Sequence, residues 1–277
     1  MPSGRAVGLL AAAILLSGGI GMVFGKHEQT DLETSVCGFL REPLAFWSFR
    51  NAAGAPDAAR VAGIRDIEQL SFTTRDGRKL GGYKLRAADP KGYLLVAQGN
   101  AMLADQIIGE FRLFRNSGLD VYLYDYRGYG LSEGKSRLKA IVSDYREIVA
   151  ALNAQGYRRR LLYGMSMGGV ILLNAVGATD QYDAAVIDSS PSRISPLGCP
   201  ESYDPVNHLP AEAPRIEIII GERDRVVPPP EMAELEKTGR DRGALVLWSP
   251  EFAHPFQDAS REIHRRRLQA VADFLLR

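Results

Sequence analysis

The sequence predicts an α/β protein whose mostly parallel central sheet carries helices on both faces. From about residue 67 onward, short and nearly unbroken apolar runs alternate with stretches of helical periodicity. The runs carry few charges, as do strands that are buried on both faces. The chain has 277 residues, 45% of them apolar, which suffices for one large domain but is short for two full-sized ones. Repeated strand–helix units favour parallel pairing of the strands.

The expected elements follow in chain order. Apolar and polar residues alternate on either side of Asp76-Gly77, which predicts a hairpin of strands at 67–74 and 79–86. Such an antiparallel hairpin is common at the edge of these sheets. The remaining strands are expected at 92–98, 120–125, 160–165, 183–188, 215–220 and 244–248. Helical spacing of apolar residues predicts helices at 104–116, 139–153, 166–176, 230–237 and 260–276.

Two segments depart from this alternation. Residues 190–214 are rich in proline and have little periodicity, so we expect a small cap over the end of the sheet that holds the site. Residues 26–66 are expected to be a connector that precedes the domain at 67–277. The connector carries aromatic residues that are expected to pack either on the domain or on a membrane surface, namely Phe39, Phe46, Trp47 and Phe49.

Residues 1–25 differ in character from the rest. Arg5 precedes an uncharged run at 6–25, which is typical of either a signal peptide or an N-terminal membrane anchor. The strongly apolar part of this run, 9–16, is short and favours a signal peptide. The full length of the uncharged run, 6–25, favours an uncleaved anchor. The preceding positive charge predicts that the rest of the chain lies outside the cytoplasm. We therefore expect an exported protein, periplasmic or anchored in the cell membrane.

Charge and cysteine content narrow the function classes. A formal net charge of +1 gives no support for a nucleic-acid partner. In an exported chain Cys37 and Cys199 form either one disulfide or two separate buried thiols. Neither cysteine has a metal-type spacing, and the four histidines form no HExxH pattern. We expect no metal site and no cofactor.

The motif that carries chemistry is Gly164-Met165-Ser166-Met167-Gly168, which fits G-x-S-x-G. In this motif the chain turns sharply from a strand into a helix, and the serine is lifted above the sheet. The positions two before and two after the serine must be small because the strand and the helix nearly touch. A buried run ends at Met165 and a helix-like run follows, so Ser166 is the predicted nucleophile of a serine hydrolase.

A serine hydroxyl needs a base, and the base needs an orienting acid. Asp224 follows the strand expected at 215–220 and is the predicted acid, with Asp188 as rival and Glu222 as a weaker one. His254 follows the strand expected at 244–248 and is the predicted base. The other histidines are assigned elsewhere: His264 to a solvated helix face, His208 to a structural role in the cap, and His27 beside the N-terminal segment.

An acyl-transfer site also needs backbone donors for the oxyanion. The N–H of Met167, directly after the nucleophile, is the first expected donor. The second is expected from the loop after the strand at 92–98, with Asn100 preferred over Ala101.

These residues resemble the α/β-hydrolase superfamily, in particular the single-domain branch with an H-G-N-A oxyanion loop. That branch includes membrane-anchored bacterial esterase-like proteins and eukaryotic protein depalmitoylases. The resemblance covers about 67–276 and rests on Gln98-Gly99-Asn100-Ala101, Asp125–Gly134 (DYRGYGLSEG), the motif around Ser166, the Asp224 loop and His254-Pro255.

The resemblance implies an α/β-hydrolase fold and an acyl-transfer hydrolase without a cofactor. It implies that the DYRGYG segment braces the site without being catalytic. One departure is Gln98, which stands where the family usually has His, and its amide is expected to donate hydrogen bonds to the loop instead.

The implied substrate is a small-molecule or lipid-like acyl ester or thioester, and a carboxylesterase for short to medium acyl groups is the preferred hypothesis. Lipase, acyl-protein thioesterase and peptidase activities are alternatives on the same fold. A non-catalytic binding protein is the alternative from another class.

Overall fold

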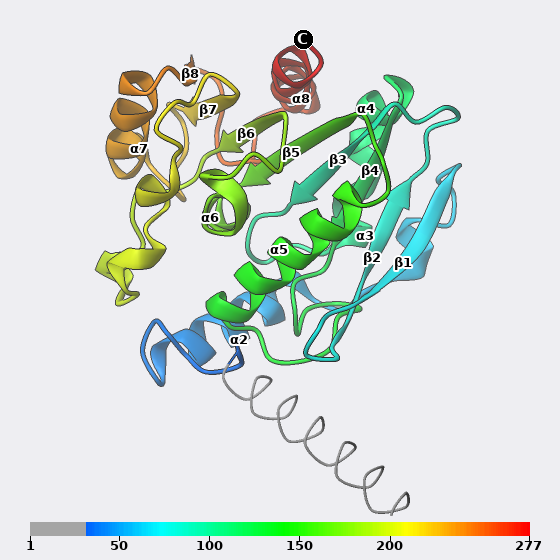
Figure 1. The fold of residues 1–277 in the computed structure, drawn as a ribbon, viewed down its shortest axis with the longest axis horizontal. Coiled ribbons are helices and arrows are strands. Elements are labelled where there is room, and N and C mark those ends of the chain that lie inside the picture. Colours follow the sequence, from blue (N-terminus) through cyan, green and yellow to red (C-terminus); the bar gives the residue numbers. More distant parts are fainter. Residues whose placement is uncertain (1–31) are drawn as a thin grey trace, which may run out of the picture.

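The computed structural model describes residues 32–277 (Figure 1). The segment 1–25, for which a signal peptide or an anchor is expected, lies outside the described residues. Between residues 32 and 277 no helix combines the length and the hydropathy that a membrane crossing requires.

Within this part of the chain, eight strands form one sheet in the order β1-β2-β4-β3-β5-β6-β7-β8. The pairs β1–β2 and β2–β4 are antiparallel and all other pairs are parallel, so the predicted hairpin and the predicted parallel sheet are both confirmed. The strands are β1 (Ile67–Thr73), β2 (Lys79–Leu85), β3 (Gly92–Ala97), β4 (Leu119–Tyr124), β5 (Arg159–Met165), β6 (Ala184–Asp188), β7 (Ile216–Gly221) and β8 (Leu245–Ser249).

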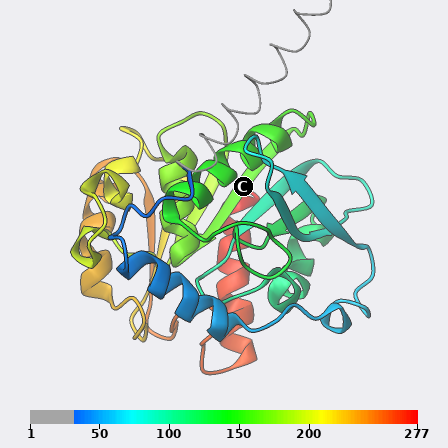
Figure 2. The same ribbon diagram turned by 90° about the horizontal axis from the view of Figure 1, so that it is seen from below.

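Helices cover both faces of this sheet, as Figure 2 shows. Side chains of a strand alternate between its faces. The helices are α2 (Arg41–Ala53), α3 (Ala104–Ile107), α4 (Arg112–Asn116), α5 (Leu138–Asn153), α6 (Met167–Leu172), α7 (Pro229–Asp241) and α8 (Arg261–Leu275). Because of this alternation, Tyr93 and Leu95 of β3 join the core beneath α5, α6 and α7, whereas Leu94 and Val96 join the core beneath α3, α4 and α8. Residues 190–214 contain three short 3₁₀ turns, η4 (Ser195–Leu197), η5 (Glu201–Tyr203) and η6 (Pro205–His208).

Three details differ from the sequence expectation. The helix expected at 104–116 is interrupted by the 3₁₀ segment η2 (Ile108–Phe111), and the one at 166–176 ends in a π-helical turn, η3 (Leu173–Gly177). The connector contains helix α2, which no periodic pattern announced. Its inward residue Phe46 packs in the core, while Phe39 and Trp47 are exposed.

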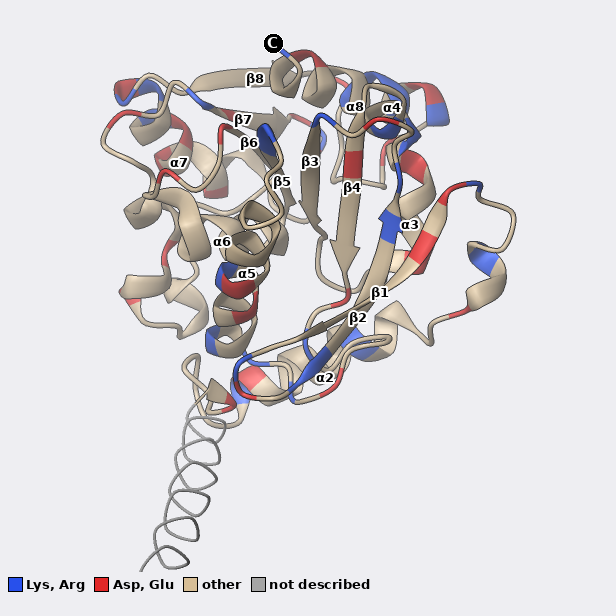
Figure 3. Cartoon of the chain, turned by 45° about the vertical axis from the view of Figure 1, so that its right-hand side comes forward, with Lys and Arg blue, Asp and Glu red and all other residues tan. Residues whose placement is uncertain are grey.

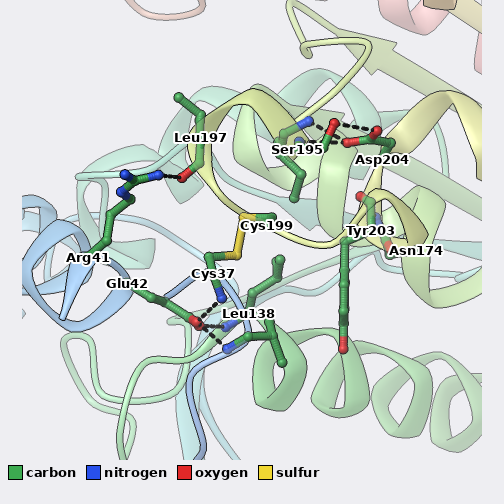
Figure 4. Close-up of a disulfide and its surroundings, with 12 residues drawn as sticks. Cys37, Arg41, Glu42, Leu138, Asn174, Ser195, Leu197, Cys199, Tyr203 and Asp204 are labelled. Atoms are coloured by element: carbon green, nitrogen blue, oxygen red, sulfur yellow. Dashed lines mark hydrogen bonds between the residues drawn. A yellow bond between two sulfur atoms is a disulfide. The ribbon is translucent and has the colours of Figure 1, made fainter. Parts of the chain in front are cut away.

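Cys37 and Cys199 are joined by a disulfide, which decides between the two alternatives left open by the sequence (Figure 4). The bond links positions 162 residues apart and ties the chain just before α2 to the segment 190–214.

Charged residues of both signs are interspersed over helix α7, and the paired strands β1 and β2 carry one glutamate and two lysines (Figure 3). One group of charges is buried. The guanidinium of Arg127, in the DYRGYG segment, lies between two carboxylates, with 2.5 Å from Nη1 to Asp76 Oδ2 and 2.5 Å from Nη2 to Asp144 Oδ1. All three side chains are almost fully buried.

We predict that Arg127→Met lowers the free energy of unfolding by about 3–5 kcal/mol, because it leaves two buried carboxylates without their cation. Urea unfolding measures this loss. In the matched control Arg160→Met, the ion pair removed is the half-exposed one to Asp183, and the expected loss is below about 1 kcal/mol. Equal losses in the two variants would contradict the prediction.

Candidate active site

Ser166 occupies a sharp turn between β5 and α6. Its φ of 53° and ψ of −117° are a conformation that non-glycine residues rarely adopt. The glycines around it have the steric role expected of the motif. A Cβ at Gly164 would lie 2.8 Å from the carbonyl oxygen of Gly168, and one at Gly168 would collide with the carbonyl of Ala97. The sequence motif therefore forms the strained strand–turn–helix that lifts a serine above the sheet.

His254 and Asp224 lie together after the ends of β8 and β7. Nδ1 of His254 is 2.8 Å from Oδ2 of Asp224, and both side chains are buried. The other carboxylate oxygen accepts the backbone N–H groups of Val226 and Val227 at 2.8 and 2.9 Å. Burial alone would raise the pKa of Asp224, but the bonds from His254 and from these two amides outweigh it and hold the pKa below its usual value of 3.8. An ionised carboxylate thus fixes the imidazole with Nδ1 as donor.

The rival acids are placed differently. The carboxylate of Asp188 is fully buried and accepts hydrogen bonds from Arg267 at 2.6 Å and from the hydroxyl of Tyr163 at 2.8 Å, not from His254. Glu222 is exposed. The arrangement favours Asp224 as the partner of His254.

The other histidines of the sequence analysis have separate positions. His208 Nε2 lies 2.8 Å from the carbonyl oxygen of Ser202 within the segment 190–214. The expectation that His264 sits on a solvated helix face is wrong. Its side chain is only 13% exposed and its ring lies 4.6 Å from that of Phe256, because α8 turns this position toward the chain that follows His254. His27 lies outside the described residues.

The loop expected to supply the second oxyanion donor lies against the turn that holds Ser166. Met167 is the first residue of α6, so its N–H has no partner inside the helix. A Cβ at Gly99 would lie 3.7 Å from the Cβ of Ser166, which places the loop after β3 against the elbow. In this loop the N–H of Ala101 points to Oδ1 of Asn100 at 3.2 Å, while the N–H of Asn100 donates to no described residue. The geometry favours Asn100 over Ala101 as the second donor.

Two tyrosines of the DYRGYG segment hold the same loop. The hydroxyl of Tyr129 donates to Oδ1 of Asn100 at 2.7 Å, and the hydroxyl of Tyr126 donates to the carbonyl oxygen of Gln98. The expectation that the Gln98 amide donates to the loop is wrong. That side chain is fully buried, and neither amide atom has a hydrogen-bond partner among the described residues. The loop is braced by the tyrosines instead.

Arg267 connects the serine turn to the histidine loop, and sequence reasoning missed it. Its guanidinium is fully buried, pairs with Asp188 and Asp258, and donates to the carbonyl of Ala253, next to His254. The backbone carbonyl of Asp188 in turn accepts the N–H of Ser166 at 2.8 Å. The sequence did contain one sign of its burial. Arg267 adjoins Leu268 and precedes Val271 by one helical turn, so helical spacing places it on the buried face of α8.

An apolar pocket of about 380 Å³ adjoins the expected oxyanion donors. Asn100 and Met167 are among its lining residues, and most of the others come from α2 and from the segment 190–214. No group of three or more residues with metal-ligating side chains is gathered anywhere in 32–277.

The sequence is similar to a known family and to several known proteins. A family model described as "Serine aminopeptidase, S33" matches residues 88–204. The uncharacterized protein YfhR of Escherichia coli K12 is 25% identical over 237 residues, covering 76% of this chain and 80% of that protein. A monoacylglycerol lipase of Mycolicibacterium smegmatis is 37% identical over 106 residues, covering 36% of this chain and 38% of the lipase.

Solved structures show the same fold. The Pyrococcus furiosus esterase Pf2001 aligns with a TM-score of 0.60 at 19% identity, covering 76% of this chain and 91% of the esterase. The protein XC6422 of Xanthomonas campestris, described as an α/β serine hydrolase without a lid, aligns with a TM-score of 0.60 at 19% identity, covering 76% and 94%. The predicted α/β-hydrolase fold is confirmed.

Proposed function

We propose that this chain, which has the α/β-hydrolase fold and matches the serine aminopeptidase family model over residues 88–204, is a serine hydrolase that cleaves carboxylic esters or thioesters through an acyl-enzyme on Ser166. The observation that carries the proposal is the strained conformation of Ser166 on a fold that also places His254 on an ionised, buried Asp224. Backbone strain of this kind is concentrated at active sites, ligand clamps and switch regions, and here it falls on the residue that the motif marks as the nucleophile.

The mechanism follows from these positions. Oγ of Ser166 attacks the acyl carbonyl carbon while Nε2 of His254 takes its proton, and the Asp224 carboxylate stabilises the imidazolium that forms. The negative oxygen of the tetrahedral intermediate accepts hydrogen bonds from the N–H groups of Met167 and Asn100. His254 then gives its proton to the leaving oxygen or sulfur as the bond to the acyl carbon breaks. Water repeats the sequence and releases the acid.

Esters or thioesters are favoured over peptides by the pocket beside the oxyanion donors, because it is almost wholly apolar. It suits an acyl chain and offers few partners for the polar backbone of a peptide. The relatives named as a lipase and an esterase support the same substrate class.

We also propose that the protein is exported, periplasmic or membrane-anchored. The Cys37–Cys199 disulfide supports this location, since disulfides persist in oxidising compartments and are rare in the cytosol. The uncharged run at 6–25 of the sequence supports it independently.

Labelling with a fluorophosphonate probe tests the proposed function. The wild-type protein is expected to label at one serine, identified by peptide mass spectrometry as Ser166, and to release p-nitrophenol from p-nitrophenyl butanoate. If a known serine hydrolase labels under the same conditions and this protein neither labels nor turns over the ester, the non-catalytic alternative is correct.

A further inference from the structure

The apolar pocket begins where an acyl carbonyl would be bound. Its lining includes Met167 and Asn100, whose backbone N–H groups are the proposed oxyanion donors. A carbonyl oxygen held between these donors places the rest of the acyl group at the mouth of the pocket. The lining also includes Phe46 and Phe49 of α2 and Ile194 of the segment 190–214. The volume of about 380 Å³ is in the range of small-molecule sites.

Helix α2 is held to the rest of the domain at several points, among them the bonds of Glu42 and the nearby disulfide (Figure 4). The buried carboxylate of Glu42 accepts the N–H groups of Val36 and Cys37 at 2.6 and 2.8 Å and that of Leu138, at the start of α5, at 2.7 Å. The Cys37–Cys199 disulfide joins the same region to the segment 190–214. These bonds therefore fix α2 in place as one wall of the pocket.

The outward side of α2 is also apolar. Leu40, Leu44 and Trp47 recur at helical spacing on the side opposite the buried Glu42 and Phe46. Together with Phe39 they are between 56% and 84% exposed, and Leu197, which also lines the pocket, is 65% exposed. A helix that is apolar on both sides is normally covered on both, and a contiguous exposed apolar patch marks an interaction surface. We call Phe39, Leu40, Leu44, Trp47 and Leu197 the α2 patch.

The sequence before α2 indicates what covers this patch. An uncharged run of membrane-compatible length ends at Gly25, which is 14 residues before Phe39. Fourteen residues span at most about 50 Å, so a bilayer that holds the run lies within reach of α2. Exposed aromatic and leucine side chains flanked by the exposed Arg41 and Arg50 are typical of helices that lie in the membrane interface.

We propose that the α2 patch rests on a lipid bilayer and that the pocket behind it receives the acyl chain of a lipid-borne ester or thioester. This inference rests on the proposed hydrolase function and specifies its substrate class. The acyl chain passes from the membrane beneath α2 into the pocket, and its carbonyl arrives between Met167 and Asn100, next to Ser166.

The first test is the chain-length profile of hydrolysis by the full-length protein in detergent. With p-nitrophenyl esters below their critical micelle concentrations, kcat/KM is expected to rise from butanoate to decanoate by up to about fourfold per methylene, as each one leaves water for the pocket. Ala45→Phe places a ring in the pocket and is expected to lower the decanoate-to-butanoate ratio by about tenfold.

The matched control is Ala52→Phe, two turns further along the same helix, exposed and not part of the pocket lining. It is expected to keep the wild-type ratio. A flat profile, or the same ratio in Ala45→Phe as in wild type, overturns the pocket assignment. Butanoate turnover that disappears in Ser166→Ala would still uphold the hydrolase function in that case, so the two failures are distinguishable.

The second test uses the two tryptophans of the chain, Trp47 in the α2 patch and Trp248 on the edge strand β8. Trp248→Phe and Trp47→Phe leave one tryptophan each. The full-length variants are reconstituted into phosphatidylcholine vesicles with or without bromine on the acyl chains, and tryptophan emission is compared.

Brominated lipid is expected to quench Trp47 at least about twofold and to leave Trp248, which is 39% exposed to solvent, nearly unchanged. Equal quenching at the two positions, or none at Trp47, overturns the bilayer assignment. Emission of Trp47 that is blue-shifted in detergent yet insensitive to bromine would mean that a second copy of the chain covers the patch, which also overturns it.

Discussion

Ser166→Ala is expected to lower kcat for ester hydrolysis by about 10⁶-fold, the scale of loss when the nucleophile of a serine–histidine–aspartate site is removed. In the proposed mechanism this hydroxyl forms the acyl-enzyme, so its removal leaves no nucleophile at the site. The remaining donors of Met167 and Asn100 still stabilise an oxyanion, so a residual rate above that in water is expected from hydroxide or water attack.

The measurement is p-nitrophenyl butanoate turnover together with fluorophosphonate labelling of the purified full-length variant. Labelling is expected to vanish. Ser202→Ala is the control, because Ser202 is an exposed serine in the segment 190–214 and its only described bond to His208 uses the backbone carbonyl. That variant is expected to stay within about twofold of wild type. Retained labelling in Ser166→Ala would show that another serine is the nucleophile.

The sequence predicts the parallel core of this fold well, because buried strands are local apolar runs. Their alternation with helices then implies that the strands pair in parallel. Helix α2 escapes such reasoning. Its residues are apolar on both sides, with Leu44 and Trp47 outward and Phe46 inward, so it lacks the one-sided stripe by which an amphipathic helix is identified. Only the fold shows that one side faces the pocket and the other faces outward.

The candidate site likewise contains residues that the sequence predicts and residues that it does not. Ser166, Asp224 and His254 each follow a strand, and the carboxyl ends of parallel strands meet at one edge of the sheet, so sequence order alone brings them to one place. Arg267 could not be assigned in this manner, because its role depends on two carboxylates 79 and 9 residues away. The expectation that the Gln98 amide donates to the loop fails because packing sets the direction of a side chain within a tight loop. Here the hydroxyls of Tyr126 and Tyr129 make the hydrogen bonds that hold the loop.

The second large loss of activity is expected when the carboxylate of Asp224 is removed. Asp224→Asn should lower kcat by about 10⁴-fold, as loss of the carboxylate does in comparable triads, since an amide does not hold the imidazole in the tautomer that leaves Nε2 free to accept a proton. The pKa of Asp224 lies below 3.8 in the folded protein. The stabilisation from its bond to His254 is therefore complete above the unfolded value and is lost only as the pH falls through the folded one. Asp224 is accordingly ionised at every assay pH between about 6 and 8, the range in which the two proteins are compared.

Asp188→Asn is the comparison that decides the assignment. It weakens the buried pair with Arg267, which is expected to lower the melting temperature, but it leaves the Asp224–His254 bond intact. Its kcat, measured well below the melting temperature, is expected to exceed that of Asp224→Asn by at least about 100-fold. A folded Asp188→Asn protein with the 10⁴-fold loss, beside an Asp224→Asn protein that remains active, would transfer the role of the acid to Asp188. The structure argues against that result, because the carboxylate of Asp188 is already engaged by Arg267 and Tyr163, whereas Asp224 holds His254 directly.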